Sequence, residues 1–231
     1  MQLLVSVRSA IEAAAAVDGG ADIVDAKDPD RGALGAVSLE VFSEIRAAIG
    51  DRRLLSAAIG DAADESAIEG TACRFARAGA AFVKVGFAGV TNPRRVAALA
   101  SAASRGIASG CSGRGQLVLV AYVDETMSIA PADLVDIAAA AGAGGVLVDT
   151  AKKDDCGLLS LIGLDALSAW VTHAHARGLL AAVAGKLTFE DLSTVQGTGA
   201  DIAGIRGAAC DGGRNGQVSA ERVRQLRTQA A

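Results

Sequence analysis

Residues 19–25 (GGADIVD), 78–86 (AGAAFVKVG), 141–149 (AGAGGVLVD) and 198–207 (TGADIAGIRG) repeat one local pattern at wide intervals along the chain. Each is a turn of small residues, glycine among them, that leads into a short apolar run. Glycine adopts the left-handed conformation that ends many helices, so the pattern is typical of a helix followed directly by a strand. The four copies therefore predict a chain of alternating helices and strands.

Eight short apolar runs and eight longer segments of helical period alternate from end to end. We expect strands at residues 3–7, 22–27, 54–60, 82–86, 116–124, 145–150, 179–185 and 202–207. We expect helices at residues 9–18, 38–49, 64–78, 93–103, 132–141, 164–177, 188–195 and 219–228. Eight strand–helix units in 231 residues predict a single (β/α)₈ TIM barrel, a fold of about 250 residues.

The competing α/β architecture is a doubly wound open sheet. Its usual marker is a G-x-G-x-x-G turn after the first strand, and residues 6–12 (SVRSAIE) lack it. There are only three prolines, and no Pro- or Ser-rich linker divides the chain. We therefore expect one catalytic barrel domain over residues 1–231.

The overall composition excludes several classes of protein. A net charge of −4 and a pI of 5.2 leave no basic stripe for nucleic acid. The apolar runs are shorter than the roughly 20 residues that span a bilayer, and the first residues lack the basic start of a secretion signal. The four cysteines show neither CxxC nor metal-ligand spacing, which favours reduced thiols in a cytoplasmic protein.

The basic residues divide unevenly into five lysines and 17 arginines. In a barrel, function collects where strands end and the following loops begin. All five lysines fall at such positions and none on an expected outer helix: Lys27, Lys84, Lys152, Lys153 and Lys186. This distribution predicts a catalytic mouth lined by lysines.

Strand periodicity orients the candidates. Side chains alternate across a strand, so Asp25 and Lys27 share a face, and Lys84 is expected to point into the mouth, toward which Asp149 also projects. Two interpretations of Lys84 stay open: a structural ion pair with Asp25 or Asp149, or a buried amine that neighbouring cations keep neutral and nucleophilic. Lysines and aspartates in one mouth suit Schiff-base and proton-transfer chemistry on a carbonyl compound.

The loops after the seventh and eighth strands are expected to bind phosphate. Many barrels hold a phosphate there against backbone N–H groups at the start of a short helix. Gly185, Lys186, Gly207 and Ala208 are the candidate contacts. Arg206 is a weaker candidate, because its position also allows an outward-pointing side chain. The alternative is a glycine-capped turn that binds nothing.

Two further features receive no catalytic role. His173 and His175, the only histidines, lie two apart on an expected helix and diverge around it. We expect both on the surface and no metal site. Residues 28–35 (DPDRGALG) predict either a mobile flap or an ordinary loop between strand and helix.

Six segments together carry a resemblance to a known family: residues 3–7 (LLVSV), 19–36 (GGADIVDAKDPDRGALGA), 83–86 (VKVG), 147–154 (LVDTAKKD), 182–187 (AVAGKL) and 201–213 (DIAGIRGAACDGG). They resemble the (5-formylfuran-3-yl)methyl phosphate synthase family over the whole chain. The resemblance implies a (β/α)₈ enzyme of methanofuran-type C1-carrier biosynthesis. Such an enzyme converts two glyceraldehyde 3-phosphate molecules into a furan aldehyde phosphate, with release of phosphate and water.

The resemblance also implies roles for individual residues. Lys27 would be the Schiff-base lysine and Lys84 the proton acceptor, while Asp25, Asp149 and Lys153 match other charged positions of the site. Lys152 receives no role, because the family has an apolar residue there. The imine is the electron sink, so neither a metal nor an organic cofactor is implied.

Two rival functions fit the same residues. One is a class I aldolase or isomerase acting on triose phosphates, and the other is a phosphate-sugar-binding barrel without chemistry. The expected partners are small triose phosphates, with no nucleic acid and no membrane. The alanine-rich outer helices are compatible with a homo-oligomer but do not require one.

Overall fold

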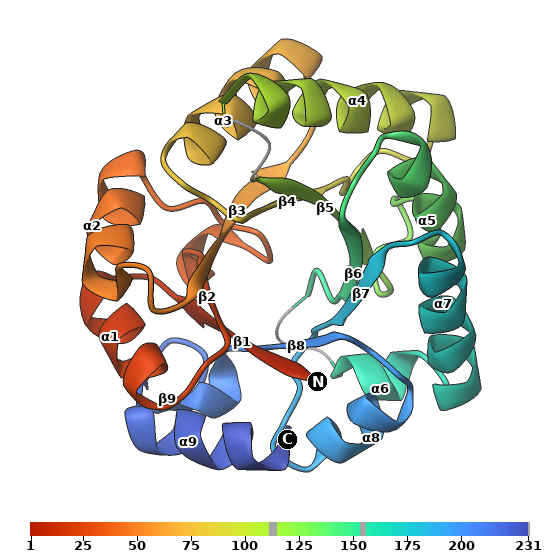
Figure 1. Cartoon of the computed structure of the whole chain (residues 1–231). Helices are drawn as coiled ribbons and strands as arrows, with labels where there is room; N and C mark the ends of the chain where they lie inside the picture. Colours follow the sequence, from red (N-terminus) through yellow and green to blue (C-terminus); the bar gives the residue numbers. More distant parts are fainter. Residues whose placement is uncertain (111–114, 153–155, 231) are drawn as a thin grey trace.

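The computed structural model describes residues 1–110, 115–152 and 156–230. Eight parallel strands close into a barrel in chain order, with β8 pairing back onto β1 (Figure 1). This confirms the predicted (β/α)₈ TIM barrel. The strands are β1 (Gln2–Val7), β2 (Ile23–Ala26), β3 (Leu54–Asp61), β4 (Phe82–Gly86), β5 (Gln116–Tyr122), β6 (Gly145–Asp149), β7 (Leu180–Val183) and β8 (Ile202–Ile205).

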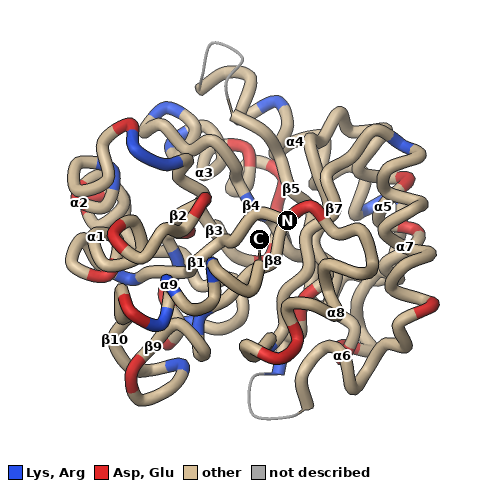
Figure 2. The backbone as a smooth tube through the Cα atoms, turned by 60° about the horizontal axis from the view of Figure 1, so that its bottom comes forward, with Lys and Arg blue, Asp and Glu red and all other residues tan. Residues whose placement is uncertain are grey.

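Helices surround the barrel as an outer ring (Figure 1). They are α1 (Ala10–Asp18), α2 (Leu39–Ile49), α3 (Glu65–Arg77), α4 (Pro93–Gly110), α5 (Pro131–Ala140), α6 (Leu158–Leu161), α7 (Leu164–Ala176), α8 (Asp191–Gly197) and α9 (Ala220–Gln229). Basic residues (Lys and Arg) and acidic residues (Asp and Glu) are interspersed over this ring (Figure 2). Across the described ranges, we find no helix with the length and apolar character needed to cross a membrane.

Local chemistry sets where several helices begin and how closely they pack. The side chains of Ser9, Ser38 and Asp64 accept backbone N–H groups at the starts of α1, α2 and α3. Helices α3 and α4 lie against each other through glycines. A Cβ on Gly106 would come within 2.2 Å of the Glu69 carbonyl oxygen, and one on Gly110 within 2.4 Å of the Cys73 carbonyl oxygen. Only glycine permits this approach.

The structure differs from the sequence prediction at several boundaries. Helix α4 continues to Gly110, where residue 103 was the predicted end, because its glycines serve packing against α3 and do not end the helix. Strand β2 ends at Ala26, so Lys27 is the first residue beyond it. The loop after β8 adds a short 3₁₀ turn, η2 (Gly207–Ala209), and a hairpin of β9 (Cys210–Asp211) with β10 (Gln217–Val218).

Small side chains line much of the barrel interior. Ser6, Ser56, Ala58, Ala182 and Gly204 stand at inward-facing strand positions, where barrels usually carry bulky branched residues. Leu4, Ile23, Phe82, Val118, Leu147 and Ile202 supply the apolar wall between them. The barrel is therefore closed by its backbone but incompletely filled by its side chains.

A buried ion pair fastens the end of β8 to α1. The Arg206 guanidinium donates to both carboxylate oxygens of Glu12, at 2.8 and 3.2 Å, and the two side chains are each only 3% exposed. Its remaining N–H groups donate to the carbonyl oxygens of Ser6, Arg214 and Gly216. One side chain thus holds together the end of β8, β1, α1 and the loop that carries the hairpin.

Replacing Glu12 by Gln is expected to destabilise the fold strongly. The change leaves the Arg206 charge buried without its counter-ion, which costs about 3 kcal/mol of unfolding free energy. Urea unfolding followed by circular dichroism measures it. Glu44→Gln is the matched control, because Glu44 is an exposed residue of α2. Its unfolding free energy is expected to stay within about 0.5 kcal/mol of the wild-type value. Equal stability of the two variants would contradict the proposed importance of the pair.

Candidate active site

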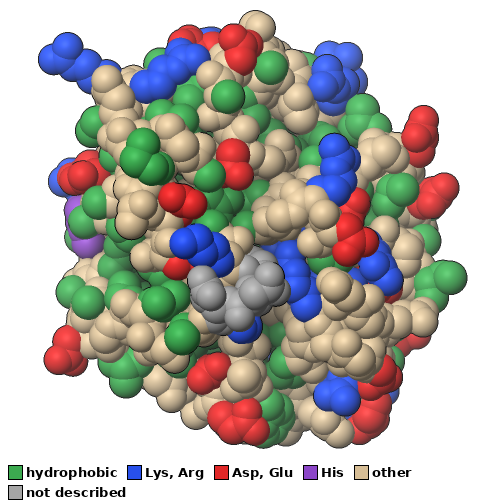
Figure 3. Space-filling model, turned by 180° about the vertical axis from the view of Figure 1, so that it is seen from behind, with side chains coloured by type: hydrophobic (Ala, Val, Ile, Leu, Met, Phe, Trp, Pro, Cys, Tyr) green, Lys and Arg blue, Asp and Glu red, His purple; other side chains and the backbone are tan. Residues whose placement is uncertain are grey.

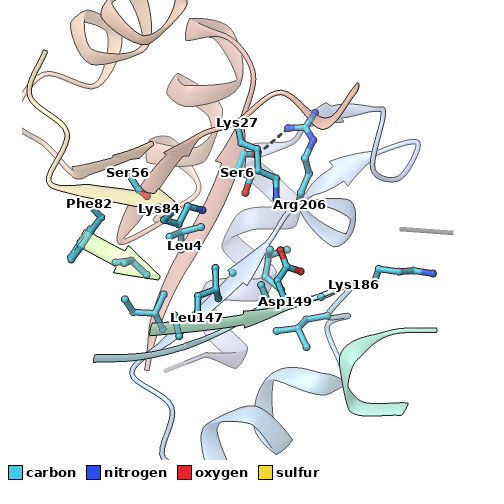
Figure 4. A pocket seen from close by; sticks show the side chains of 18 of the residues that line it. Leu4, Ser6, Lys27, Ser56, Phe82, Lys84, Leu147, Asp149, Lys186 and Arg206 are labelled. Atoms are coloured by element: carbon cyan, nitrogen blue, oxygen red, sulfur yellow. Dashed lines mark hydrogen bonds between the residues drawn. The ribbon is translucent and has the colours of Figure 1, made fainter. Parts of the chain in front are cut away.

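A cavity of 330 Å³ enters the barrel from the carboxyl ends of its strands. Its wall carries Lys27, Lys84, Asp149 and Lys186, together with the hydroxyl residues Ser6 and Ser56 (Figure 4). Five of the charged residues singled out in the sequence, these four and Arg206, therefore line one cavity. Viewed from this end, basic side chains gather about the centre of the face (Figure 3), although the chain as a whole is acidic.

Asp25 and Lys84 form a buried ion pair at this end of the barrel. Lys84 Nζ lies 2.7 Å from Asp25 Oδ2, and Ser6 Oγ donates to the same oxygen at 2.9 Å. Asp25 has no accessible surface and Lys84 is 5% exposed. Of the two interpretations left open for Lys84, the structure realises the ion pair with Asp25.

Asp25 stays ionised despite its burial. Burial by itself raises the pKa of this carboxyl. The charges of Lys84 and Lys27 and the hydrogen bonds from Lys84 and Ser6 outweigh that penalty and hold its pKa below the ordinary value. The site therefore contains an ionised carboxylate that bonds to one lysine and feels the charge of a second. Sequence reasoning missed Ser6, although a polar residue at an inward position of an apolar strand was the available signal.

Lys27 follows β2 directly and points into the same cavity (Figure 4). Its backbone N–H donates to the Val7 carbonyl oxygen at 2.9 Å, which extends the β1–β2 pairing by one residue. The side chain is 6% exposed, and its charge contributes to the lowered pKa of Asp25. The lysine is thus held at the rim, close to the buried carboxylate.

Asp149 reaches the cavity from β6, on the wall opposite β2 (Figure 4). It is 2% exposed, and its Oδ1 accepts the Thr150 backbone N–H at 2.7 Å. Lys153 lies outside the described residues. Lys152 is exposed, and Asp124 anchors its backbone by accepting the N–H groups of Ala151 at 2.6 Å and Lys152 at 2.8 Å. The sequence analysis did not single out Asp124.

The loops after β7 and β8 meet at the rim of the cavity. Gly185, Lys186, Gly207 and Ala208 all line it. Gly185 has φ 113° and Lys186 φ 56°; within the described ranges, Lys186 is the one residue other than glycine with positive φ. A lysine held in this strained conformation is a feature that clusters at ligand sites.

Arg206 does not play the part considered for its side chain. The guanidinium is buried and lies between the end of β1, where it donates to the Ser6 carbonyl oxygen, and Glu12 at the start of α1 (Figure 4). All five of its N–H groups donate to Glu12 or to backbone carbonyls. No donor of the side chain is left for a phosphate, and Arg206 shapes the loop instead.

Residues 28–35 form an anchored loop at the rim. Pro29–Arg31 make a 3₁₀ turn, η1, and Leu34 is 2% exposed among the residues inside the barrel. Arg214 clamps the loop by donating to the carbonyl oxygens of Pro29 and Gly32, both at 3.1 Å. Of the two interpretations, the ordinary strand-to-helix loop is the one that the structure shows.

A second hydrogen-bonded group sits beside the cavity. Tyr122 donates its hydroxyl to Asp61 Oδ1 at 3.1 Å, and burial first, then the charge of Asp61, raises the pKa of the phenol. Gly86 lies against both: a Cβ there would come within 2.2 Å of Asp61 Oδ1 and 2.6 Å of the Tyr122 oxygen. Tyr122 therefore stays a neutral phenol and serves packing of the rim.

The histidines lie on the surface of α7, as expected. His173 faces Asp136 at 3.1 Å and His175 faces Asp201 at 2.8 Å, both away from the barrel mouth. Within the described parts of the chain, no three His, Cys, Asp or Glu side chains are placed to hold a metal ion.

Removing the Asp25 charge is expected to destabilise the barrel and to alter its acid sensitivity. The folded-state pKa is lowered from 3.8, so the stabilisation is complete at neutral pH and is lost as the pH falls below 3.8 through the lowered value. The Asp25→Asn variant lacks this stabilisation at every pH and leaves the Lys84 ammonium without its counter-ion. Its unfolding free energy at pH 7 is expected to be about 3 kcal/mol lower than that of the wild type.

Urea unfolding at pH 7 and again in acid, below the ordinary carboxyl range, measures this loss. The difference in unfolding free energy between wild type and Asp25→Asn is expected to become smaller in acid. Asp211→Asn, at an exposed ion pair with Arg222, is the control and costs under about 1 kcal/mol. A difference in unfolding free energy that does not change with pH would contradict the lowered pKa of Asp25.

Solved structures share the fold at low sequence identity. KGPDC from Streptococcus mutans aligns with a TM-score of 0.70 at 18% identity, over 99% of this chain and 96% of that one. A 3-hexulose-6-phosphate synthase aligns with a TM-score of 0.67 at 22% identity, over 100% of both chains. Similarity at these identities shows the barrel architecture alone.

Sequence relatives are closer and cover nearly the whole chain. The Methanosarcina barkeri and Methanopyrus kandleri proteins are each 36% identical to it, over 229 and 231 residues, and cover 98% and 97% of this chain and 97% of their own length. Both are named (5-formylfuran-3-yl)methyl phosphate synthase, as is the Archaeoglobus fulgidus protein at 34% identity over 230 residues. The family described as 4-HFC-P synthase matches residues 3–227. The chain therefore belongs to the (5-formylfuran-3-yl)methyl phosphate synthase family.

Proposed function

We propose that this protein condenses two molecules of glyceraldehyde 3-phosphate into (5-formylfuran-3-yl)methyl phosphate through a Schiff base on Lys27, with release of phosphate and water. The observation that carries the proposal is the buried trio of Lys27, Asp25 and Lys84, in which two amines flank one ionised carboxylate. The names of the relatives support the product, and methanofuran-type cofactor biosynthesis is the setting that this product implies.

Lys27 is proposed as the nucleophile. Its side chain is 6% exposed and stands near the ammonium of Lys84 across the Asp25 carboxylate. Burial and a neighbouring cation are the two conditions that make a lysine amine nucleophilic. Attack on the aldehyde of one triose phosphate gives a carbinolamine, and loss of water from it gives the imine. The imine withdraws electrons from the adjacent carbon, so no metal or organic cofactor enters the proposal.

Lys84 is proposed to transfer protons in two successive steps. Paired with Asp25, it starts as an ammonium and donates a proton to the departing hydroxyl of the carbinolamine. The resulting amine then accepts the proton from the carbon next to the imine, which yields an enamine. Asp25 remains ionised beside it and stabilises each positive charge as it forms.

The later steps use the rest of the rim. The enamine expels phosphate with its electron pair, which leaves the imine conjugated to an enol. The second triose is isomerised to its ketone form, and the terminal carbon of the enol adds to that ketone carbon, which gives the branched skeleton of the product. The terminal hydroxyl of the second triose then closes the ring onto the carbon next to the imine, loss of two waters forms the furan, and hydrolysis of the imine releases the aldehyde. Asp149 and Lys153 are proposed to shuttle protons in these steps. The backbone of Gly185, Gly207 and Ala208, with the Lys186 ammonium, is proposed to hold the retained phosphate, supported by their common position on the cavity rim.

Glyceraldehyde 3-phosphate alone is expected to give a product with the near-ultraviolet absorbance of a furan aldehyde. Borohydride added during turnover is expected to fix the substrate on Lys27, because it reduces an imine to a stable amine. Peptide mass spectrometry locates the adduct. Lys27→Arg keeps the charge but cannot form the imine, so both adduct and product are expected to disappear while circular dichroism is unchanged.

The alternatives give different products. Simple isomerisation, or an aldol product without a furan, would indicate the triose-phosphate aldolase or isomerase. Saturable binding of the triose with no adduct would indicate the barrel that binds without chemistry. Either result contradicts the proposal.

Lys84→Gln is expected to separate imine formation from the later proton transfer. The amide still donates a hydrogen bond to Asp25, but it cannot accept a proton. Product formation is expected to fall by about 10²-fold or more, and exchange of the carbon-bound proton with deuterated water is expected to stop. The borohydride adduct on Lys27 still forms, but more slowly, because Lys84 also donates the proton to the departing hydroxyl of the carbinolamine. Lys152→Gln is the matched control, with wild-type turnover expected. Exchange at the wild-type rate in Lys84→Gln would refute the role.

A further inference from the structure

We propose that Ser56 Oγ and Asp25 Oδ1 form a subsite for a hydroxyl group, and that this subsite takes the hydroxyl next to the aldehyde of the triose carried on Lys27. The inference rests on the proposed function and assigns Ser56 a binding role in it. It arises from two buried oxygens, one in the wall of the cavity and one beside it, that bond to none of the residues described so far.

The two residues stand side by side inside the barrel. Ser56 on β3 pairs in register with Asp25 on β2. Ser56 lines the cavity and has no exposed surface (Figure 4). Its next inward neighbour on β3, Ala58, pairs in turn with Lys84 on β4. The serine hydroxyl therefore lies beside the ion pair, on the same wall of the cavity.

Both oxygens lack a hydrogen-bond partner within the described chain. Ser56 Oγ and Asp25 Oδ1 are buried and bond to no described group, whereas Asp25 Oδ2 receives both Lys84 and Ser6. Buried polar atoms in folded proteins nearly always have partners. Two such atoms stand side by side, Ser56 in the cavity wall and Asp25 directly beside it in register, and they point to a ligand group that bonds to both.

The chemistry of the two oxygens selects a hydroxyl. An ionised carboxylate only accepts hydrogen bonds, while a serine hydroxyl both donates and accepts. An alcohol can donate to Asp25 Oδ1 and accept from Ser56. An aldehyde oxygen has no proton to donate, and a phosphate would be repelled by the Asp25 charge. Strands lie about 4.8 Å apart, a gap that two hydrogen bonds of about 2.8 Å can bridge through one oxygen.

The location gives the subsite a purpose in the proposed reaction. A hydroxyl on Asp25 Oδ1 brings its carbon close to Lys84, which bonds to the other oxygen of the same carboxylate. That carbon is the one whose proton Lys84 removes. Ser56 thus orients the carbon–hydrogen bond, and it favours an aldehyde that bears a neighbouring hydroxyl.

The test compares Ser56→Ala with wild type on two aldehydes. Glyceraldehyde 3-phosphate carries the hydroxyl, and glycolaldehyde phosphate has the aldehyde and phosphate without it. Borohydride trapping over a range of concentrations gives the half-saturating value for each. In Ser56→Ala, this value is expected to rise about three- to tenfold for glyceraldehyde 3-phosphate, the loss of one hydrogen bond, and to stay unchanged for glycolaldehyde phosphate.

Two controls separate ligand binding from a structural role. Ser56→Thr keeps the hydroxyl and is expected to restore most of the affinity, which also covers the case that the alanine variant folds poorly. Ser128→Ala removes another hydroxyl that lacks a partner among the described residues but does not line the cavity, and it is expected to change neither value. The melting temperature of Ser56→Ala is expected to stay level or rise, because an unpaired buried hydroxyl is removed.

Each contrary outcome has a distinct meaning. An equal rise of the half-saturating concentration for both aldehydes would show that the Ser56 hydroxyl binds a water molecule or stabilises the fold. It would overturn the subsite. Unchanged trapping of glyceraldehyde 3-phosphate in Ser56→Ala would overturn it as well, with the proposed function intact. Absence of an adduct in the wild type with either aldehyde would overturn the proposed function and the subsite together.

Discussion

The carboxylate of Asp25 is the constraint from which the arrangement of the barrel mouth follows. An ionised group without accessible surface is tolerated only where cations and donors surround it. Lys84 from β4 and Ser6 from β1 supply them at 2.7 and 2.9 Å. Because these partners come from strands on either side of β2, one anion fixes the relative positions of several strand ends. It also places Lys27, two residues later, in the same electrostatic field.

A second buried ion pair, between Arg206 and Glu12, gives the arginines at the rim a structural role. Arg206 gives every N–H group to Glu12 and to nearby carbonyls, so it shapes the loop after β8 and leaves no donor for a ligand. Arg214 clamps the loop after β2 in a similar way. Arg206 and Arg214 line the cavity as the lysines do, but their hydrogen bonds to backbone carbonyl oxygens hold loops together, whereas Lys84 bonds to the buried Asp25 carboxylate. This is the physical content of the lysine distribution seen in the sequence.

The sequence carried the fold and part of the site for identifiable reasons. The strand–helix alternation repeats eight times and the glycine turn four times, so the barrel and the inward direction of Asp25, Lys27 and Lys84 could be predicted. Whether Lys84 meets Asp25 or Asp149 depends on the stagger between strands, which no local pattern encodes. The burial of the Arg206 guanidinium depends on Glu12, an acidic residue on α1 that resembles any surface helix position. Ser6 and Ser56 escaped notice because an isolated serine carries no motif.

The shortage of aromatic residues, 3% of the chain, matters most inside the barrel. Bulky side chains normally fill such an interior, whereas Ser6, Ser56, Ala182 and Gly204 leave a cavity of 330 Å³. That volume is near the lower limit of about 300 Å³ for ligand pockets, which suits small substrates. Because the wall below the charges is apolar, a small molecule in the cavity is surrounded by little water, and the field of Asp25 and its amines acts on it with little screening. The residues that weaken packing of the core are therefore those that make room for a small ligand beside a buried anion, as the proposed imine requires.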